Sequence, residues 1–283
     1  LYYAELAGTV SPQVIGPHSA HILRQIRIEF PNIRVALQWL LATQAVESSL
    51  RLCSVLSQYW NIASSRDAMS FLEAALALAA DHPPTPAYED TLATAGFMSF
   101  TLEVGGSARH YFEQCLAMNQ TIGNLGNPKK IGFSNGLLGW IRFDQGDYAT
   151  AQAYLATAKE NDLATGDRWA LAMTLANQGK MAARLGEFER AHHLLEEALA
   201  LHRQVGEAWG IAVTLIIQSF LLLLQNQFEE AAITLGQSYS ICQEIQAEGL
   251  LADVHRHSAL IALHRREQDK AYTLLREALL IRR

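Results

Sequence analysis

The sequence predicts an all-α protein: a superhelical solenoid of six helical hairpins with a 40-residue period, preceded by short linker helices. Three observations predict this fold. All seven prolines lie in the first 128 of the 283 residues, so no proline interrupts helices in the remainder. The later segments are rich in Ala, Leu, Glu, Gln and Arg, which favour helices, and alternating β-branched runs are missing. Similar segments also return at an almost constant interval.

The repeat is anchored on one alanine in each segment, as in GEFERAHHLLEEALAL around Ala191. The intervals between successive anchors are 40, 43, 40, 40 and 40 residues. The longer interval contains the turn-rich stretch Gly123–Lys130, which easily accommodates three additional loop residues. The six anchors are Ala68, Ala108, Ala151, Ala191, Ala231 and Ala271.

This period divides the chain into an N-terminal helical linker or cap, residues 1–45, and an array, residues 46–283. Each unit is expected to hold two helices, because Leu171, Leu175 and Ala182 follow helical spacing up to Gly186 and the pattern resumes after it. Since one hairpin cannot bury its apolar face alone, neighbouring hairpins must stack. The units are approximately 46–86, 87–126, 127–166, 167–206, 207–246 and 247–283. Small residues recur twelve positions before the anchor, where helices approach closely: Gly139, Gly179, Ser219 and Ala259.

Composition excludes several classes of protein. Half of the residues are apolar and 18% are charged, so the chain can form a sizeable core. The net charge of −6 argues against direct nucleic-acid binding. The three cysteines, Cys53, Cys115 and Cys242, have no CxxC spacing, which is typical of a reducing, cytoplasmic environment and of small core thiols.

The most apolar run, Ile211–Leu224, is too short to cross a membrane. It has 14 residues, whereas a spanning helix needs about 20. It also falls in register as the first helix of the fifth unit, so we expect a buried helix and no membrane association. Part of its apolar surface exceeds what one buried stripe needs and is available for a ligand or a protein contact.

The third unit, with Leu138-Gly139, Gly146, Ala151, Leu155 and Ala158, resembles the tetratricopeptide (TPR) signature. A TPR unit has about 34 residues, and the additional six correspond to nearly one extra turn on each helix. The resemblance implies a right-handed superhelix in which the first helix of each unit lines the concave face. It also implies binding of a protein, a peptide or a small inducer there.

The N-terminal segment resembles the linker that precedes the TPR array in bacterial STAND-type signalling ATPases, many of which regulate transcription. The matching residues are Glu29, Asn32, Ile33, Arg34, Ala36, Leu37 and Trp39, followed by Leu52 and Trp60. The resemblance implies that a nucleotide-binding domain lies upstream and that this chain, a fragment, is the inducer-sensing end. We expect Trp39 and Trp60 to lie in the core.

No motif for catalysis, a cofactor or a metal is found. A phosphate loop needs GxxxxGK followed by Ser or Thr, but Gly179-Lys180 is followed by Met181. HExxH, GxSxG and EF-hand patterns are also missing. The histidine pairs 192/193 and 255/257 do not face one way along a helix, so we expect surface or helix-terminus histidines and not a zinc site. The chain is therefore not expected to be an enzyme.

Transferring the inward-facing TPR positions to this sequence predicts a groove with aromatic, basic and apolar steps. Such a groove suits a ligand with apolar or aromatic parts and a negative group. Two alternatives stay open: the aromatic rings fill gaps between hairpins, and Lys180 with Arg184 forms only a solvated face. The predicted groove residues are Phe97, Phe100, Trp140, Phe143, Asp144, Lys180, Arg184, Phe220, Leu224, Arg256 and His264.

Two tryptophans, Trp169 and Trp209, occupy equivalent places at the start of a first helix. They form either a ridge for a partner protein or a packing contact with the end of the preceding unit.

The last segment differs from the rest of the chain in charge. Residues 255–283 contain seven Lys or Arg and three acidic residues, and no polar capping helix follows the sixth unit. We therefore expect this end either to continue in the natural protein or to pair with another copy. A scaffold for oligomerisation or autoinhibition, with no ligand of its own, is the alternative to a sensor.

Overall fold

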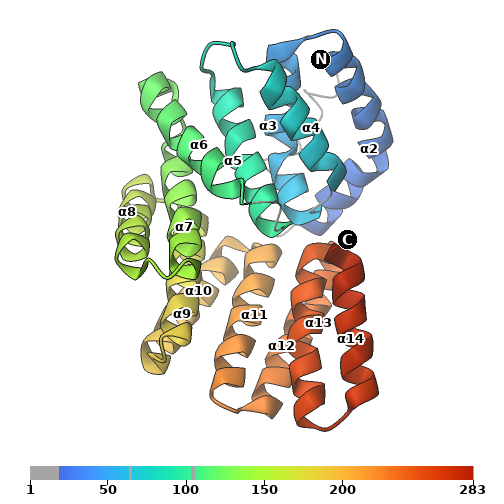
Figure 1. Cartoon of the computed structure of the whole chain (residues 1–283), viewed down its shortest axis with the longest axis vertical. Coiled ribbons are helices and arrows are strands. Elements are labelled where there is room, and N and C mark those ends of the chain that lie inside the picture. Colours follow the sequence, from blue (N-terminus) through green and yellow to red (C-terminus); the bar gives the residue numbers. More distant parts are fainter. Residues whose placement is uncertain (1–18, 64–65, 103–105, 283) are drawn as a thin grey trace. The chain divides into compact units, whose positions relative to one another are not determined.

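The computed structural model describes residues 19–63, 66–102 and 106–282 of the chain. Within these ranges it contains thirteen α-helices, one short 3₁₀ helix and no strand, which confirms the all-α prediction (Figure 1). The chain forms two compact units, Leu1–Gly166 and Asp167–Arg283, and each is described by itself.

The first unit contains a long N-terminal helix and three helical hairpins. Its helices are α2 (Ser19–Ala42), α3 (Val46–Ala63), α4 (Arg66–Leu78), α5 (Pro86–Thr101), α6 (Ala108–Ile122), α7 (Pro128–Asp144) and α8 (Tyr148–Thr165). Consecutive helices pack against each other, and the first helices also contact one another, α3 with α5 and α5 with α7.

The second unit contains three hairpins of nearly uniform length. They are α9 (Arg168–Arg184) with α10 (Phe188–Val205), α11 (Ala208–Leu224) with α12 (Phe228–Ile245), and α13 (Glu248–His264) with α14 (Gln268–Arg282). The first helices α9, α11 and α13 lie next to one another in that order. The six hairpins of the described residues therefore follow the predicted period.

The connections explain the one irregular interval. Gly166-Asp167, Gly206-Glu207 and Gln246-Ala247 join successive hairpins with two residues each. The connection between α6 and α7, which includes the 3₁₀ helix Gly123–Leu125, has five residues (123–127). The three additional residues thus lie in a loop, as predicted.

The anchor alanines lie at the contact between the two helices of each hairpin. All six are buried: Ala68, Ala108, Ala151, Ala191, Ala231 and Ala271. The small residues twelve positions earlier face the second helix. A Cβ added at Gly139 would lie 2.8 Å from Leu155 Cγ, and one at Gly179 would lie 2.8 Å from Leu195 Cγ and Cδ2. The alanine at 259 and the serine at 219 are also buried.

The N-terminal helix departs from one expectation. Ile33 and Leu37 on α2 are buried, and Trp60 on α3 is fully buried, as predicted. Trp39, however, is 64% exposed, so its assignment to the core is wrong. Residues two apart on a helix point about 200° apart, so Trp39 lies on the side of α2 opposite to Leu37.

The remaining core predictions hold. Cys53, Cys115 and Cys242 are free and buried. The apolar run Ile211–Leu224 forms most of α11, whose Ile217 and Leu221 pack against Leu195 of α10. In the described part of the chain, no helix is both long and apolar enough to span a bilayer.

Candidate functional site

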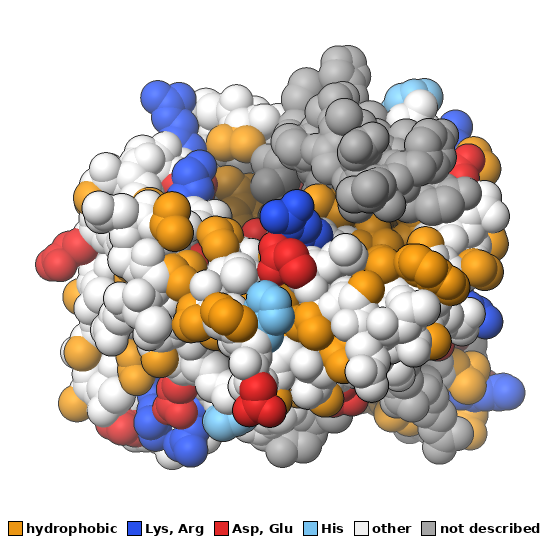
Figure 2. Space-filling view, turned by 90° about the horizontal axis from the view of Figure 1, so that it is seen from above, with side chains coloured by type: hydrophobic (Ala, Val, Ile, Leu, Met, Phe, Trp, Pro, Cys, Tyr) orange, Lys and Arg blue, Asp and Glu red, His pale blue; other side chains and the backbone are white. Residues whose placement is uncertain are grey.

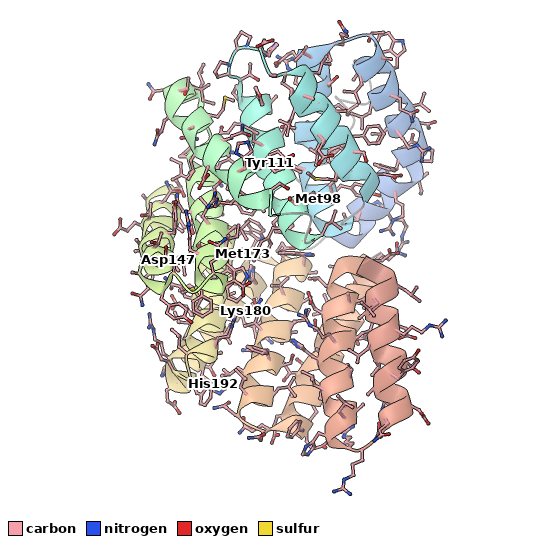
Figure 3. The ribbon with its side chains drawn as sticks, viewed as in Figure 1. Met98, Tyr111, Asp147, Met173, Lys180 and His192 are labelled. Atoms are coloured by element: carbon pink, nitrogen blue, oxygen red, sulfur yellow. The ribbon has the colours of Figure 1, made fainter. Side chains whose placement is uncertain are left out.

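The first helices of the second unit place two predicted residues at one repeat position, Lys180 on α9 (Figure 3) and Phe220 on α11. Leu260 has the same repeat position on α13. Lys180 and Phe220 are partly buried, whereas Leu260 is exposed. Because α9, α11 and α13 are neighbours, residues at one repeat position form a row across the three helices.

A buried histidine of α13, three residues before Leu260, contacts this row. The hydroxyl of Ser219 is 2.7 Å from the carbonyl oxygen of Ile216 and donates to it. The same hydroxyl oxygen is 3.0 Å from Nδ1 of His257. Since the hydroxyl proton is already used, we infer that Nδ1 carries the imidazole proton and donates it to Ser219. The Phe220 ring stacks on the imidazole, with centroids 5.9 Å apart.

Charges from two helices act on this imidazole. The pKa of His257 is lowered to about 4, mainly by burial and also by the charges of Arg256 and Lys180, while Asp253 opposes the shift. The side chain of His257 is therefore neutral at pH 7. Lys180 belongs to α9, whereas Arg256 and Asp253 belong to α13. Charged side chains of both helices therefore influence the pKa of His257.

The chemistry of this row favours binding. Ser219 is fully buried and donates its proton to a backbone carbonyl, not to the imidazole, so it is not arranged as a nucleophile with a histidine base. Arg256 is exposed and forms an ion pair of 2.7 Å with Asp253. Among the described residues, no group of three or more His, Cys, Asp or Glu could hold a metal ion.

Three other predicted residues lie near the C-terminal ends of the first helices. Arg184 and His264 are exposed and Leu224 is 40% exposed. The His264 ring stacks on Phe228 of α12 with centroids 3.5 Å apart and planes 7° apart. Next to it, Arg265 donates to Glu229 at 2.6 Å, so these contacts join the turns of two neighbouring hairpins.

In the first unit the predicted aromatic residues are mostly enclosed. Phe97, Trp140 and Phe143 are buried, Phe100 is partly buried, and Asp144 is exposed at the end of α7. Phe97 packs on Phe133 at 5.8 Å, and Trp140 packs on Phe143 at 5.6 Å between ring centroids. This packing favours the alternative that the rings fill gaps between helices. Figure 2 shows hydrophobic side chains in small separate groups among polar ones on the face that it displays.

The tryptophan pair has a structural explanation. The indole Nε1 of Trp169 donates to Glu207 Oε2 at 3.0 Å, and Glu207 also accepts from the backbone nitrogens of Trp209 and Gly210. Burial raises the pKa of Glu207, and these three hydrogen bonds oppose the shift. Trp169 thus contacts the start of the following hairpin, because Glu207 is the N-cap of α11.

The buried histidine was not among the residues predicted for the site. The prediction that His255 and His257 are surface or helix-terminus residues is wrong for His257, which is buried. A signal was present in the repeat: the residues at the same position of the third and fifth units are Leu137 and Ile217, and both are buried. His202 is fully buried as well, and burial lowers its pKa to about 4.

Comparison with known proteins supports the fold. No protein-family model matches the sequence, and no curated protein matches it. A solved structure of a Rap protein complexed with competence and sporulation factor aligns with a TM-score of 0.66 and 11% identity, over 96% of this chain and 76% of that one. Aspartyl phosphate phosphatase F from Bacillus subtilis aligns with a TM-score of 0.59 and 14% identity, over 91% of this chain and 74% of that one. At such identities the likeness concerns the fold alone: the chain has a TPR-like helical-repeat fold similar to that of Rap proteins.

Proposed function

We propose that this chain is a non-catalytic binding module that recognises a protein, a peptide or a small inducer on the face formed by α9, α11 and α13. The observation that supports this proposal is the stacking of Phe220 on the neutral imidazole of His257, on which the charges of both Lys180 and Arg256 act. A ring beside two cations suits a ligand that presents an apolar group next to a negative one. Arg184, Leu224 and His264 extend the proposed surface along the same helices.

The electrostatics of His257 add a feature to this proposal. Its imidazole stays neutral because it is buried and because Lys180 and Arg256 lie nearby. A carboxylate or phosphate bound between these cations would reduce their effect on the imidazole and raise its pKa. Binding of an anion at this row is therefore expected to strengthen as the pH falls toward 4.

The solved neighbours are consistent with a binding role. The Rap protein of the comparison was solved as a complex with competence and sporulation factor, so a protein of similar fold holds a second molecule. We extend only this general capacity to the present chain. The identity of its ligand is left to the experiment.

We further propose that residues 1–45 act as a linker and that residues 46–283 are the sensing array of a STAND-type regulator in the cytoplasm. The matched residues Ile33, Leu37, Leu52 and Trp60 are buried, as residues that join a linker helix to an array should be. The buried free thiols support a reducing compartment. A phosphate loop encoded upstream of Leu1 would support the ATPase context, and an upstream region without one would contradict it.

Fluorescence anisotropy with two labelled peptide pools tests the binding role. One pool combines Asp and Glu with Phe and Leu, and the matched pool replaces the acidic residues with Lys. We expect only the acidic pool to bind, and we expect Lys180→Glu to weaken binding by about tenfold, equivalent to 1.4 kcal/mol. The matched control is Arg203→Glu, the same charge change at an exposed site on α10. Equal binding of both pools, or equal loss in both variants, would contradict the proposal.

The alternative is a scaffold for oligomerisation or autoinhibition with no ligand of its own, and such a scaffold would bind neither peptide pool.

A further inference from the structure

A buried polar pair joins two first helices of the second unit. Ser219 on α11 has the repeat position of Gly179 and Ala259, and His257 on α13 has the repeat position of the buried Ile217. Small and apolar residues are therefore accommodated at both positions, so the repeat itself requires neither the hydroxyl nor the imidazole. Because burying polar groups costs free energy unless they are hydrogen-bonded, packing alone does not explain the pair.

The hydrogen bonds of Ser219 determine the tautomer of His257. The hydroxyl donates to the carbonyl oxygen of Ile216 at 2.7 Å, and its oxygen lies 3.0 Å from Nδ1 of the imidazole. Nδ1 therefore carries the proton, and a neutral imidazole protonated on Nδ1 has a lone pair on Nε2. Since the pKa of His257 is about 4, this neutral form is present at pH 7. Nε2 is thus a hydrogen-bond acceptor.

The accepting nitrogen of His257 is open to solvent. Among the described residues, the fully enclosed polar atoms without a hydrogen-bond partner include both ring nitrogens of His202 but neither ring nitrogen of His257. Nδ1 of His257 is paired with Ser219, and Nε2 is directed elsewhere on the ring. The residue is 6% exposed, so the open part of the imidazole is small and includes Nε2. A small chemical group of a ligand can therefore reach this acceptor.

The surroundings of the imidazole indicate which kind of group would reach it. The ring of Phe220 stacks on the imidazole, with centroids 5.9 Å and planes 25° apart. Lys180 of α9 and Arg256 of α13 act on it with positive charge, Asp253 of α13 opposes them, and α11 contains no charged residue. A ligand at Nε2 would thus lie beside an aromatic ring and near two cations. Such surroundings suit an aromatic group that belongs to an acidic molecule.

We propose that Nε2 of His257 is a specificity-determining acceptor that selects acidic ligands whose aromatic group carries a hydrogen-bond donor, such as a phenol hydroxyl. This inference rests on the proposed ligand face of α9, α11 and α13 and names the chemistry which that face selects. An aromatic group without a donor would cover Nε2 and leave it without a partner, which lowers affinity. Ser219 is a positioning residue, because it holds the imidazole proton on Nδ1.

Nitrogen-15 NMR spectra of the 283-residue chain at pH 7 test the tautomer without any ligand. We expect the signals of His257, assigned by their loss in His257→Ile, to show the proton on Nδ1. Ser219→Ala places alanine where Ala259 stands in the next hairpin, so the fold should tolerate it. It should move part of the proton population to Nε2. A proton on Nε2 in the parent chain, or a tautomer unchanged by Ser219→Ala, overturns the proposal.

Fluorescence anisotropy with two acidic peptide pools tests the selectivity. One pool combines Asp, Glu and Leu with Tyr, and the matched pool has Phe in place of Tyr, so the two differ only in the phenol hydroxyl. We expect the Tyr pool to bind about tenfold more tightly, because one hydrogen bond to Nε2 is gained. This preference should disappear in His257→Ile and in Ser219→Ala.

The matched control for Ser219→Ala is Ser238→Ala on α12. Ser238 is also fully buried and donates to a backbone carbonyl, that of Ala212, and its replacement should leave the preference for Tyr unchanged. Circular dichroism checks that each variant is folded. Equal binding of the two pools to the parent chain would overturn the selectivity and leave the ligand face intact. Binding of neither pool would contradict the proposed function, and the selectivity with it.

Discussion

Two glycines inside helices should respond oppositely to the same substitution. Gly179 in α9 faces α10, and a Cβ added there would lie 2.8 Å from Cγ and Cδ2 of Leu195. Gly236 in α12 is exposed, and an added Cβ would meet no atom within 4 Å. Both lie in mid-helix, so replacement by alanine yields the same intrinsic gain of about 0.8–1.0 kcal/mol at each site.

The difference between the two sites comes from packing. Leu195 is fully buried, in a cluster with Leu175, Ala191 and Ala198. Forcing a methyl group into such a site costs about 1–3 kcal/mol. Gly236→Ala should therefore stabilise the chain by about 1 kcal/mol, while Gly179→Ala should be neutral or destabilising by up to about 2 kcal/mol.

Urea unfolding followed by far-UV circular dichroism measures both changes. A double-mutant cycle makes the test specific to the contact. In the background of Leu195→Ala, which removes the obstructing atoms, Gly179→Ala should become stabilising, with a coupling energy of about 1–3 kcal/mol. Equal stabilisation by Gly179→Ala and Gly236→Ala in the parent chain would refute the close approach of α9 and α10.

Three further predictions concern stability. His202 and His257 both have a pKa of about 4 in the folded chain, below the ordinary value near 6.5 for the unfolded chain. Their contribution to stability should be complete above pH 6.5 and lost as the pH falls to 4, at up to about 1.4 kcal/mol per pH unit for each. His202→Asn should remove about half of this slope in urea titrations, and an unchanged slope would contradict the assignment. Gln246→Gly and Arg266→Gly, at φ of 54° and 60°, should each stabilise by up to about 1 kcal/mol, and a loss at either site would contradict left-handed strain. Trp169→Phe removes a donor to the buried Glu207 carboxylate and should cost about 1–3 kcal/mol, with no change if that hydrogen bond is not formed.

The hairpin pattern could be predicted because it depends on close contacts that recur. An alanine at each anchor and a small residue twelve positions earlier are needed wherever two helices approach closely, and these positions are visible in a single sequence. The turns are visible for a similar reason. Gly146 and Gly186 have φ of 83° and 80°, and glycine adopts that conformation without strain.

The burial of individual side chains on the first helices was harder to predict than the location of those helices in the sequence. A repeat position shows which way a side chain points but not how close the next helix lies. Trp140 and Lys180 share one position, yet Trp140 is buried and Lys180 only partly buried. Trp39 was misplaced for another reason, since a family motif indicates which residue recurs and does not indicate on which side of α2 it lies.

In this fold the repeat position of a residue determines whether its side chain is buried, whereas the residue type determines the chemical properties of that buried side chain. Eleven positions after the anchor, the second helix of four successive hairpins has a buried polar or sulfur-containing residue: Asn119, Asp162, His202 and Cys242. Their surroundings differ greatly. The Asn119 amide donates to the Glu89 carboxylate, while neither ring nitrogen of His202 has a hydrogen-bond partner among the described atoms. The same enclosed position thus holds an amide with a partner in one hairpin and an imidazole kept neutral by burial in another. It follows that His202→Asn should change the response to pH and also lower the stability by about 1–3 kcal/mol, because the amide would lack the carboxylate partner that Asn119 has in its own hairpin.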